Sequence, residues 1–280
     1  MLQITDSLTL QTQIKQWKVR QQSLALVPTM GNLHQGHLQL VHKAKSCGDK
    51  VLVSIFVNPM QFAPGSDFDR YPRTLKQDAQ QLEELGVDAL FAPAVEDIYP
   101  QDLGQTTKVV VPGLSDILCG EFRPGHFIGV STIVAKLFNL VQPDVAVFGE
   151  KDYQQLAIIK KMVGDLGFAV QVEGVSTIRE VDGLAMSSRN QYLTQQERIV
   201  APHLYQTLLA VKEQINSGAK PFPEIESHAI QTLSQAGFKA EYISIRQADT
   251  LAPATDNSSP LVVLAAAWLG KARLIDNISL

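Results

Sequence analysis

The segment VPTMGNLHQGHL, residues 27–38, joins a short apolar run to a glycine-containing turn that carries two histidines. The run at residues 24–28 is a candidate buried strand, and a helix is expected from about residue 36 to residue 47. A helix that begins at the carboxyl end of a parallel strand attracts phosphate, because its first amides are unpaired and its dipole is positive there. The imidazoles of His34 and His37 can donate to phosphate oxygens at this point, so the turn is a candidate phosphate-binding site.

Two other interpretations of the histidine pair stay open on the motif alone. His34 and His37 could simply cap the helix or face solvent. They could also bind zinc, but a zinc pair usually has i, i+4 spacing on a helix or a third ligand, and no cluster of Cys, His or Glu lies near them in the sequence. The neighbouring motifs therefore have to decide between these interpretations.

The composition is that of a folded protein that is expected in a reducing compartment. Of 280 residues, 45% are hydrophobic and 19% are charged, which is ordinary for a globular chain. The net charge of −4 argues against a protein that coats nucleic acid. Two cysteines, Cys47 and Cys119, offer no disulfide framework. The N-terminus lacks the apolar core of a secretory signal, and the apolar run at residues 261–269 is too short to cross a bilayer, so a cytoplasmic location is expected.

Apolar runs alternate with helix-period segments, a pattern typical of β-α-β units. The fold class expected is therefore α/β, with a Rossmann-like parallel sheet in the N-terminal domain. Helices are expected at residues 71–85 and 152–166, with Gly86 and Gly167 at their C-caps. The expected strands are residues 24–28, 51–57, 87–92, 108–111, 145–148 and 169–175.

The pattern changes near residue 177. A loop at residues 179–190 leads to a helix around residues 200–211, and a second helix is expected at about residues 223–235. Strands are expected at residues 241–247, 261–267 and 273–278. We expect a first domain at residues 1–177 and a smaller α+β domain at residues 178–280, with hinge closure of the second domain over a nucleotide.

Further motifs agree with the histidine turn. PTMGNLHQGH at residues 28–37 resembles the HIGH-type signature of the nucleotidyltransferase superfamily. The other motifs are FVNPMQF at residues 56–62, YPRT at 71–74, CGEFRPGHF at 119–127, FGEKDYQQ at 148–155 and MSSRN at 186–190. In this order and spacing, the set resembles the pantoate–β-alanine ligase family from the first strand to the end of the chain.

The resemblance implies an adenylate-forming amide ligase that acts in two steps. Pantoate attacks the α-phosphate of ATP, which gives pantoyl adenylate and pyrophosphate. The amine of β-alanine then attacks the acyl carbon, which gives pantothenate and AMP. An acyl phosphate has a good leaving group in AMP, whereas a free carboxylate resists amines, so the enzyme has to stabilise charge and exclude water.

Site residues follow from the matching motifs. His37 corresponds to the proposed proton donor to pyrophosphate, and His34 shares the catalytic role. Gln61 and Gln155 are implied to bind pantoate, and Gln61 and Asn58 to bind β-alanine. The side chains of Met30, Phe62, Ile133 and Val134 are expected to pack on the gem-dimethyl group. The residues implied to bind ATP are Met30, Gly31, Asn32, Leu33, His34, Gln35, Gly36, His37, Gly149, Glu150, Lys151, Asp152, Ile178, Met186, Ser187, Ser188 and Arg189.

Further expectations also rest on the resemblance. Mg²⁺ is expected to accompany ATP, and Asp78 and Gln81, one helical turn apart, match an acidic metal site of the family. Tyr71, Arg123 and His126 resemble residues at the rim of the active site. A homodimer is implied, with ATP, pantoate and β-alanine as small-molecule partners and with no nucleic-acid or membrane partner.

Other functions remain as alternatives. A nucleotidyltransferase acting on a phosphorylated small molecule would share the histidine turn, but it would need a cationic acceptor pocket and would not require both glutamines. A class I aminoacyl-tRNA synthetase would need a basic anticodon-binding region. A non-catalytic nucleotide-binding regulator is disfavoured because His34, His37, Lys151, Ser187 and Arg189 are all present.

Overall fold

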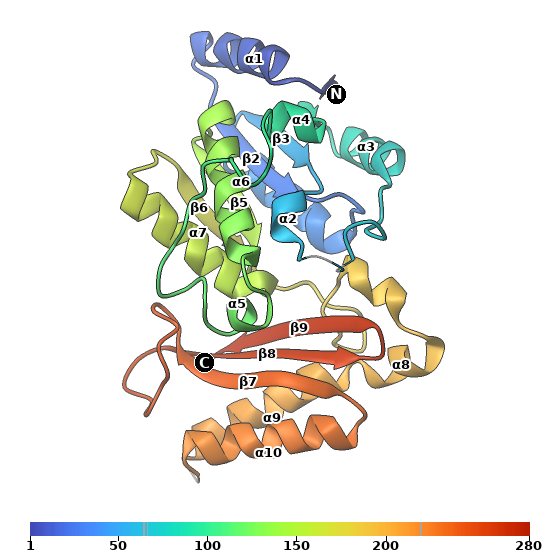
Figure 1. The fold of residues 1–280 in the computed structure, drawn as a ribbon, viewed down its shortest axis with the longest axis vertical. Coiled ribbons are helices and arrows are strands. Elements are labelled where there is room, and N and C mark those ends of the chain that lie inside the picture. Colours follow the sequence, from blue (N-terminus) through green and yellow to red (C-terminus); the bar gives the residue numbers. More distant parts are fainter. Residues whose placement is uncertain (64, 66, 219) are drawn as a thin grey trace. The chain divides into compact units, whose positions relative to one another are not determined.

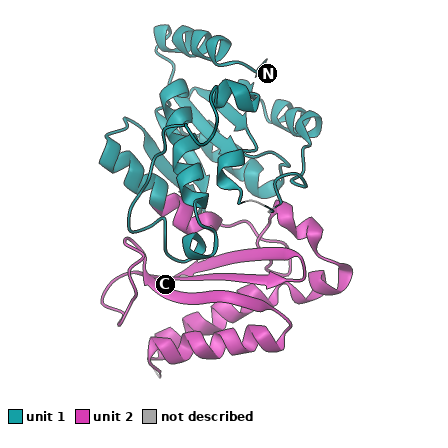
Figure 2. Cartoon of the chain, in the orientation of Figure 1, with its two compact units in different colours: residues 1–150, 158–176 teal, residues 151–157, 177–280 magenta. Residues whose placement is uncertain are grey.

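The structure, a computed structural model, describes residues 1–63, 65, 67–218 and 220–280. It separates into two compact units (Figure 2): residues 1–150 with 158–176, and residues 151–157 with 177–280. Helix α7 (Tyr153–Leu166) therefore begins in the second unit and continues in the first. That residues 1–177 and 178–280 fold as separate domains stays a prediction.

The first unit is built on a six-stranded parallel sheet in the order β1-β4-β3-β2-β5-β6 (Figure 1). Strand β2 pairs with β3 on one side and with β5 on the other. The strand order reverses between β2 and β5, which is where open parallel sheets bind ligands. The expected Rossmann-like α/β class is confirmed. The strands are β1 (Leu2–Ile4), β2 (Leu24–Thr29), β3 (Lys50–Ile55), β4 (Ala89–Phe91), β5 (Val145–Gly149) and β6 (Gln171–Val175).

Helices and an apolar core support this sheet. Residues 24–27 of β2 are at most 2% exposed, as expected for a strand covered on both faces. Gly86 and Gly167 have φ of +68° and +65°, which confirms them at the helix ends where the sequence placed them. The helices of the first unit besides α7 are α1 (Ser7–Val19), α2 (Gln35–Lys45), α3 (Leu75–Glu84), α4 (Val95–Ile98), α5 (Cys119–Phe122) and α6 (His126–Val141).

Helix α6 was not expected from the sequence; most of its residues are apolar and buried. Gly129 of this helix lies against the 3-10 helix η1 (Pro59–Gln61). A Cβ at Gly129 would lie 2.5 Å from the carbonyl of Met60 and 2.6 Å from the amide nitrogen of Gln61. Only glycine lets the two backbones come this close, and η1 carries one of the expected substrate-binding residues.

Two expectations about elements of the first unit were wrong. Residues 108–111 form no strand; the amide of Val109 instead donates to Thr132 Oγ1 at 3.0 Å, and Pro112 follows at once. The helix expected from residue 71 begins at Leu75, because Pro72 disfavours helical geometry at Tyr71. The short edge strand β1 and helix α1 were not expected.

The second unit is an antiparallel sheet in the order β7-β8-β9 with two long helices packed on it. Its strands are β7 (Lys239–Gln247), β8 (Leu261–Leu269) and β9 (Ala272–Ser279), and its helices are α8 (Gln195–Val200), α9 (His203–Ser217) and α10 (Phe222–Gln235). Apolar side chains of α9, α10 and the three strands form one core. The smaller α+β architecture expected for this part of the chain is confirmed.

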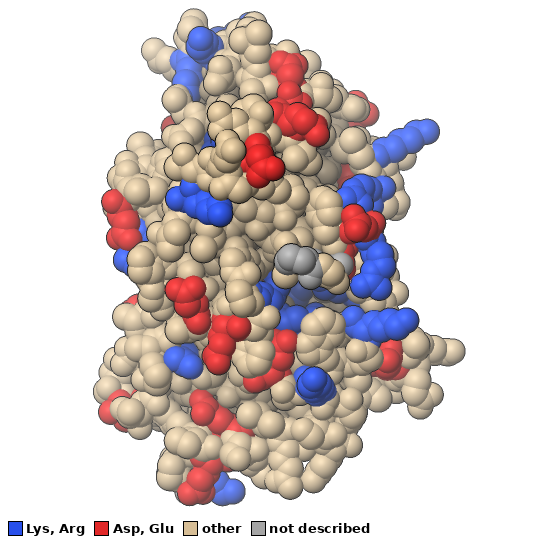
Figure 3. All heavy atoms as spheres, viewed as in Figure 1, with Lys and Arg blue, Asp and Glu red and all other residues tan. Residues whose placement is uncertain are grey.

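Lysine and arginine side chains are interspersed with aspartate and glutamate on the face shown in Figure 3, in line with the small net charge. Within the described residues, every helix is too short or too polar to span a membrane. Cys47 and Cys119 are free thiols.

Candidate active site

The turn after β2 is held in an unusual backbone conformation by a buried carboxylate. Gly31 and Asn32 both have positive φ, +82° and +52°. A Cβ at Gly31 would lie 3.1 Å from Asp78 Oδ2, so this position requires glycine. The amides of Asn32 and Leu33 donate to Asp78 Oδ2 and Oδ1, each at 2.9 Å. Asp78 is 1% exposed, and it therefore anchors the turn from helix α3.

The two histidines close the first turn of helix α2 through their Nδ1 atoms. The amide of Gly36 donates to His34 Nδ1 at 3.1 Å, and the amide of His34 donates to His37 Nδ1 at 3.3 Å. The ring centroids lie 4.0 Å apart. A nitrogen that accepts from an amide carries no hydrogen, so each neutral ring has its hydrogen on Nε2. Both rings are thereby set as Nε2–H donors at the amino end of a helix.

This arrangement confirms the capping interpretation and is suited to phosphate binding as well. The histidines do cap the helix, as the simplest interpretation requires, but capping uses only Nδ1. The helix begins at Gln35, after the turn that follows the end of β2 at Thr29, and β2 pairs with β5 in the sheet. Nε2–H donors and a positive helix end are both suited to a phosphate group.

The segment Asn58–Gln61 lies beside the turn and is fixed by buried hydrogen bonds. Gln61 is 8% exposed, and its Nε2 donates to the sulfur of Met30 at 3.0 Å. Asn58 Nδ2 donates to Gln61 Oε1 at 3.1 Å. The amide group of Gln61 is therefore oriented with its oxygen toward Asn58 and its nitrogen toward the turn that carries the histidines.

Of the residues expected at the rim, His126 contacts this segment, Arg123 contacts His126, and Tyr71 is buried. Arg123 Nη1 lies 3.1 Å from His126 Nε2, and His126 Nδ1 lies 2.8 Å from the carbonyl of Gln61. Since the carbonyl can only accept, His126 donates from Nδ1 and Arg123 donates to Nε2. Tyr71 is 5% exposed and packs edge-on against Phe62 with ring centroids 5.9 Å apart. Tyr71 is thus buried beside Phe62, and its place at the rim of the active site stays a prediction.

The expected metal site at Asp78 and Gln81 has the wrong chemistry for a cation. Besides the two backbone amides, Thr74 Oγ1 donates to the Asp78 carboxylate at 3.1 Å. Gln81 lies on the same helix and is partly exposed. Within the described residues, no group of three or more His, Cys, Asp or Glu could hold a metal ion. A carboxylate that already accepts from two amides and a hydroxyl does not fit a protein-held Mg²⁺ site.

A second set of expected residues follows β5. Gly149 ends the strand, Glu150 accepts from Ser176 at 3.2 Å, and residues 150–152 form a 3-10 turn before α7. Lys151, Asp152 and Gln155 belong to the second compact unit. Gln155 lies in the first turn of α7 and is partly exposed. The strand–turn–helix arrangement expected for GEKD is confirmed.

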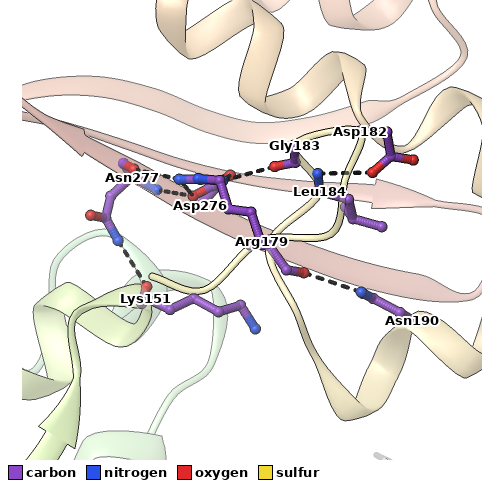
Figure 4. Close-up of polar contacts among 9 residues, drawn as sticks. Lys151, Arg179, Asp182, Gly183, Leu184, Asn190, Asp276 and Asn277 are labelled. Carbon is purple, nitrogen blue, oxygen red and sulfur yellow. Dashed lines mark hydrogen bonds and ion pairs between the residues drawn. The ribbon is translucent and has the colours of Figure 1, made fainter. Parts of the chain in front are cut away.

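The loop that carries MSSRN is held by an ion pair that the sequence did not indicate (Figure 4). Arg179 Nη1 and Nη2 donate to the two oxygens of Asp276 on β9, at 2.6 and 2.9 Å, and Asp276 is 3% exposed. The Arg179 guanidinium also lies 3.5 Å from the centre of the Tyr205 ring. Next to Asp276, Asn277 Nδ2 donates to the carbonyl of Lys151 at 2.9 Å. One end of β9 therefore supports both the loop and the lysine turn.

Within this loop the remaining expected residues are brought together. The amide of Met186 donates to the carbonyl of Ile178 at 2.9 Å, so residues 178 and 186 face each other across a hairpin. Ser187 Oγ accepts from the amide of Arg189 at 3.2 Å and caps a 3-10 helix that runs from Ser188 to Tyr192. The expected residues thus form one group in the first unit and one in the second.

The pKa of the Lys151 ammonium is lower than that of an ordinary lysine. Lys151 is partly exposed, and desolvation by the protein atoms around its side chain lowers the pKa of Lys151. Repulsion from Arg189 and Arg179 lowers the pKa further. Attraction by Asp152 and Asp276 acts in the opposite direction.

If Lys151 binds ATP, the affinity for ATP should fall as the pH rises. The fall should begin at a lower pH than the one at which an ordinary lysine loses its charge. The charged ammonium attracts phosphate, and because its pKa is lowered, that charge is lost before about pH 10.4. Above the pKa, the dissociation constant should rise by at most about tenfold per pH unit. Titration calorimetry with ATP from about pH 7 to about pH 10 measures this change. Lys151→Arg, which stays charged, should flatten the profile, whereas identical profiles for both proteins would contradict the assignment.

The parallel sheet, its switch point and the histidine turn define an α/β protein of the HIGH-type nucleotidyltransferase class. Residues 3–279 match the family model described as pantoate-beta-alanine ligase. A pantothenate synthetase of Aeromonas hydrophila is 56% identical over 277 residues, which cover 99% of this chain and 97% of the relative. The chain belongs to the pantoate–β-alanine ligase family, whose members are enzymes that form an amide bond with ATP.

Solved structures agree with this family. The crystal structure of pantothenate synthetase from Thermus thermophilus superposes with a TM-score of 0.92 at 45% identity and covers 99% of both chains. The pantoate-beta-alanine ligase of Francisella tularensis, described as complexed with beta-gamma ATP and beta-alanine, gives a TM-score of 0.84 at 35% identity, with 100% of this chain and 97% of that one covered.

Proposed function

We propose that the chain condenses (R)-pantoate with β-alanine to pantothenate, through pantoyl adenylate, with release of pyrophosphate and AMP. The family and the relatives described above support this activity. The observation that carries the mechanism is the pair of Nδ1–amide hydrogen bonds that set His34 and His37 as Nε2–H donors at the amino end of α2.

In the first step, His34 and His37 bind the triphosphate of ATP. Negative charge grows on the bridging oxygen as pyrophosphate leaves, and an Nε2–H donor stabilises that charge. His37 acts on the departing group as a hydrogen-bond donor, because its Nδ1 accepts from the His34 amide and the neutral ring keeps its only hydrogen on Nε2. The amides of the turn at residues 30–37 add donors around the same phosphates.

Two carboxamides, those of Gln61 and Gln155, hold pantoate. An amide nitrogen donates to a carboxylate or a hydroxyl without neutralising the nucleophile, as a guanidinium would. Support for Gln61 comes from its orientation, because its nitrogen is directed away from Asn58. The same side chain then meets the amine of β-alanine during the second step.

Four further residues are proposed as phosphate ligands. Lys151 acts as a point charge, and Ser187, Ser188 and Arg189 act as hydroxyl and guanidinium donors. Gly149, Glu150 and Asp152 contact the nucleotide, with Asp152 accepting from a ribose hydroxyl. Ile178 and Met186 provide backbone contacts to adenine.

Mg²⁺ enters with ATP as part of the substrate, bound to its phosphates. The engaged carboxylate of Asp78 supports this view over a protein-held site. We further propose that the enzyme works as a homodimer in the cytoplasm, as the resemblance implies.

An omission assay tests the function. AMP formation is measured with ATP, pantoate and β-alanine together and with each left out in turn. The ligase should form AMP only with all three, and it should exchange labelled pyrophosphate into ATP only when pantoate is present. Pyrophosphate release that requires a phosphorylated acceptor instead would indicate the alternative nucleotidyltransferase, and no turnover in any mixture would contradict both.

A further inference from the structure

A line of buried hydrogen bonds leads from Tyr99 to the proposed pantoate ligand Gln61. Tyr99 Oη donates to Asn58 Oδ1 at 2.9 Å, and Asn58 Nδ2 donates to Gln61 Oε1 at 3.1 Å. The three residues are 4%, 1% and 8% exposed. Tyr99 directly follows α4, 41 residues from Asn58, so the contact depends on the fold.

Asn58 uses its whole hydrogen-bonding capacity within the protein. Its Oδ1 accepts from Tyr99 and from the amide of Met60 at 3.3 Å. Its Nδ2 donates to Gln61 and to the carbonyl of Gly129 at 3.0 Å. A side-chain amide offers two acceptor lone pairs and two hydrogens, and all four are engaged. The resemblance assigns Asn58 to β-alanine, but a saturated side chain has no group left to offer a substrate.

These partners also leave no ambiguity about which way each amide faces. A backbone amide can only donate and a carbonyl can only accept, so Met60 and Gly129 identify the oxygen and the nitrogen of Asn58. Asn58 then donates to Gln61, and the atom that receives this bond must be Oε1. Of the two hydrogens on Gln61 Nε2, one points to Met30 Sδ.

We propose that Tyr99 and Asn58 are positioning residues that hold the Gln61 amide so that it presents its Nε2–H group, and not its oxygen, to the acidic substrate. This inference rests on the proposed function, in which that substrate is pantoate. The carboxylate and hydroxyl oxygens of the substrate can accept the Nε2 hydrogen of Gln61. A reversed amide would instead place its own oxygen next to the carboxylate, where the two would repel each other. The orientation therefore selects an organic acid at this position.

The Tyr99 hydroxyl is suited to a permanent donor. Its pKa is raised by burial, so the hydroxyl stays protonated throughout the neutral range. The ring is held by Phe56, with centroids 6.1 Å apart, and by the ammonium of Lys136, 5.6 Å from its centre. Tyr99→Phe thus removes the hydroxyl and leaves the packing of the ring in place.

The test compares steady-state kinetics of the wild type and Tyr99→Phe. We expect KM for pantoate to rise by roughly tenfold, the equivalent of one hydrogen bond, with KM for ATP changed less than about twofold. Tyr242→Phe, on β7 of the second unit, is the matched control and should keep the wild-type KM for pantoate. A wild-type KM for pantoate in Tyr99→Phe, or equal rises in both KM values, would overturn the proposal.

A double-mutant cycle with Gln61→Ala separates positioning from a general structural effect. If Tyr99 acts through Gln61, adding Tyr99→Phe to Gln61→Ala leaves KM for pantoate unchanged; if the two effects multiply, the proposed route is wrong. Thermal unfolding of each variant checks that it is folded. Asn58→Asp is a second way to break the line of hydrogen bonds. Its carboxylate still accepts from Tyr99 but cannot donate to Gln61. Absence of pantoate-dependent AMP formation in the wild type would instead refute the proposed function itself.

Discussion

Replacing His37 by alanine is expected to slow pantoyl adenylate formation by about 10²–10³-fold, the usual contribution of one positioned donor to developing negative charge. The ring supplies an Nε2–H donor to the charge that grows on the leaving pyrophosphate, and alanine supplies none. Single-turnover formation of the adenylate, with β-alanine omitted, isolates this step. The protein should stay folded, because the lost Nδ1 cap costs only about 1 kcal/mol.

Two further variants separate the capping role of His37 from its role toward phosphate. Asparagine places an oxygen near the position of Nδ1, so His37→Asn should keep the hydrogen bond from the His34 amide yet remain as slow as alanine. Glutamine places an NH₂ near the position of Nε2, so His37→Gln should recover part of the rate. If His37→Asn formed adenylate at the wild-type rate, the ring would be only a helix cap and the mechanism proposed for it would be wrong.

Replacing Arg179 by methionine is expected to lower the free energy of unfolding by about 3–5 kcal/mol. The variant leaves Asp276, which is 3% exposed, as a buried carboxylate without its bidentate partner. It also removes the guanidinium that stacks on Tyr205 and donates to the carbonyl of Gly183. Urea denaturation, followed by circular dichroism, measures the change.

The same loop offers a matched control. Arg198 pairs with Asp182, and their side chains are 36% and 41% exposed, so Arg198→Met should cost less than about 1 kcal/mol. Adding Asp276→Asn to Arg179→Met should regain much of the lost stability, because no uncompensated charge then stays buried. Equal losses in the free energy of unfolding for Arg179→Met and Arg198→Met would show that burial of the Arg179–Asp276 pair does not increase the cost of breaking it.

Local patterns in the sequence were enough for the fold class and for most of the first sheet. The run at residues 24–28, the glycine turn and the histidines are close in the chain, so their arrangement follows from strand, turn and helix preferences alone. The same is true of the GEKD turn after β5 and of the glycines that end α3 and α7. Helix α6 was missed because a mostly apolar segment can be read as a buried strand or a buried helix when only the sequence is available.

The amino-acid sequence by itself determined the parallel sheet, the histidine turn and, through the ordered motifs, the family. Only the tertiary structure decided what orients those residues: Asp78 reaches the turn from 46 residues away, Tyr99 reaches Asn58 from 41, and Asp276 reaches Arg179 from 97. It also changed Asp78 from an expected metal ligand into the anchor of the turn. Hydrogen-bond partners so distant in the chain are chosen by sheet order and helix packing, which no local pattern records.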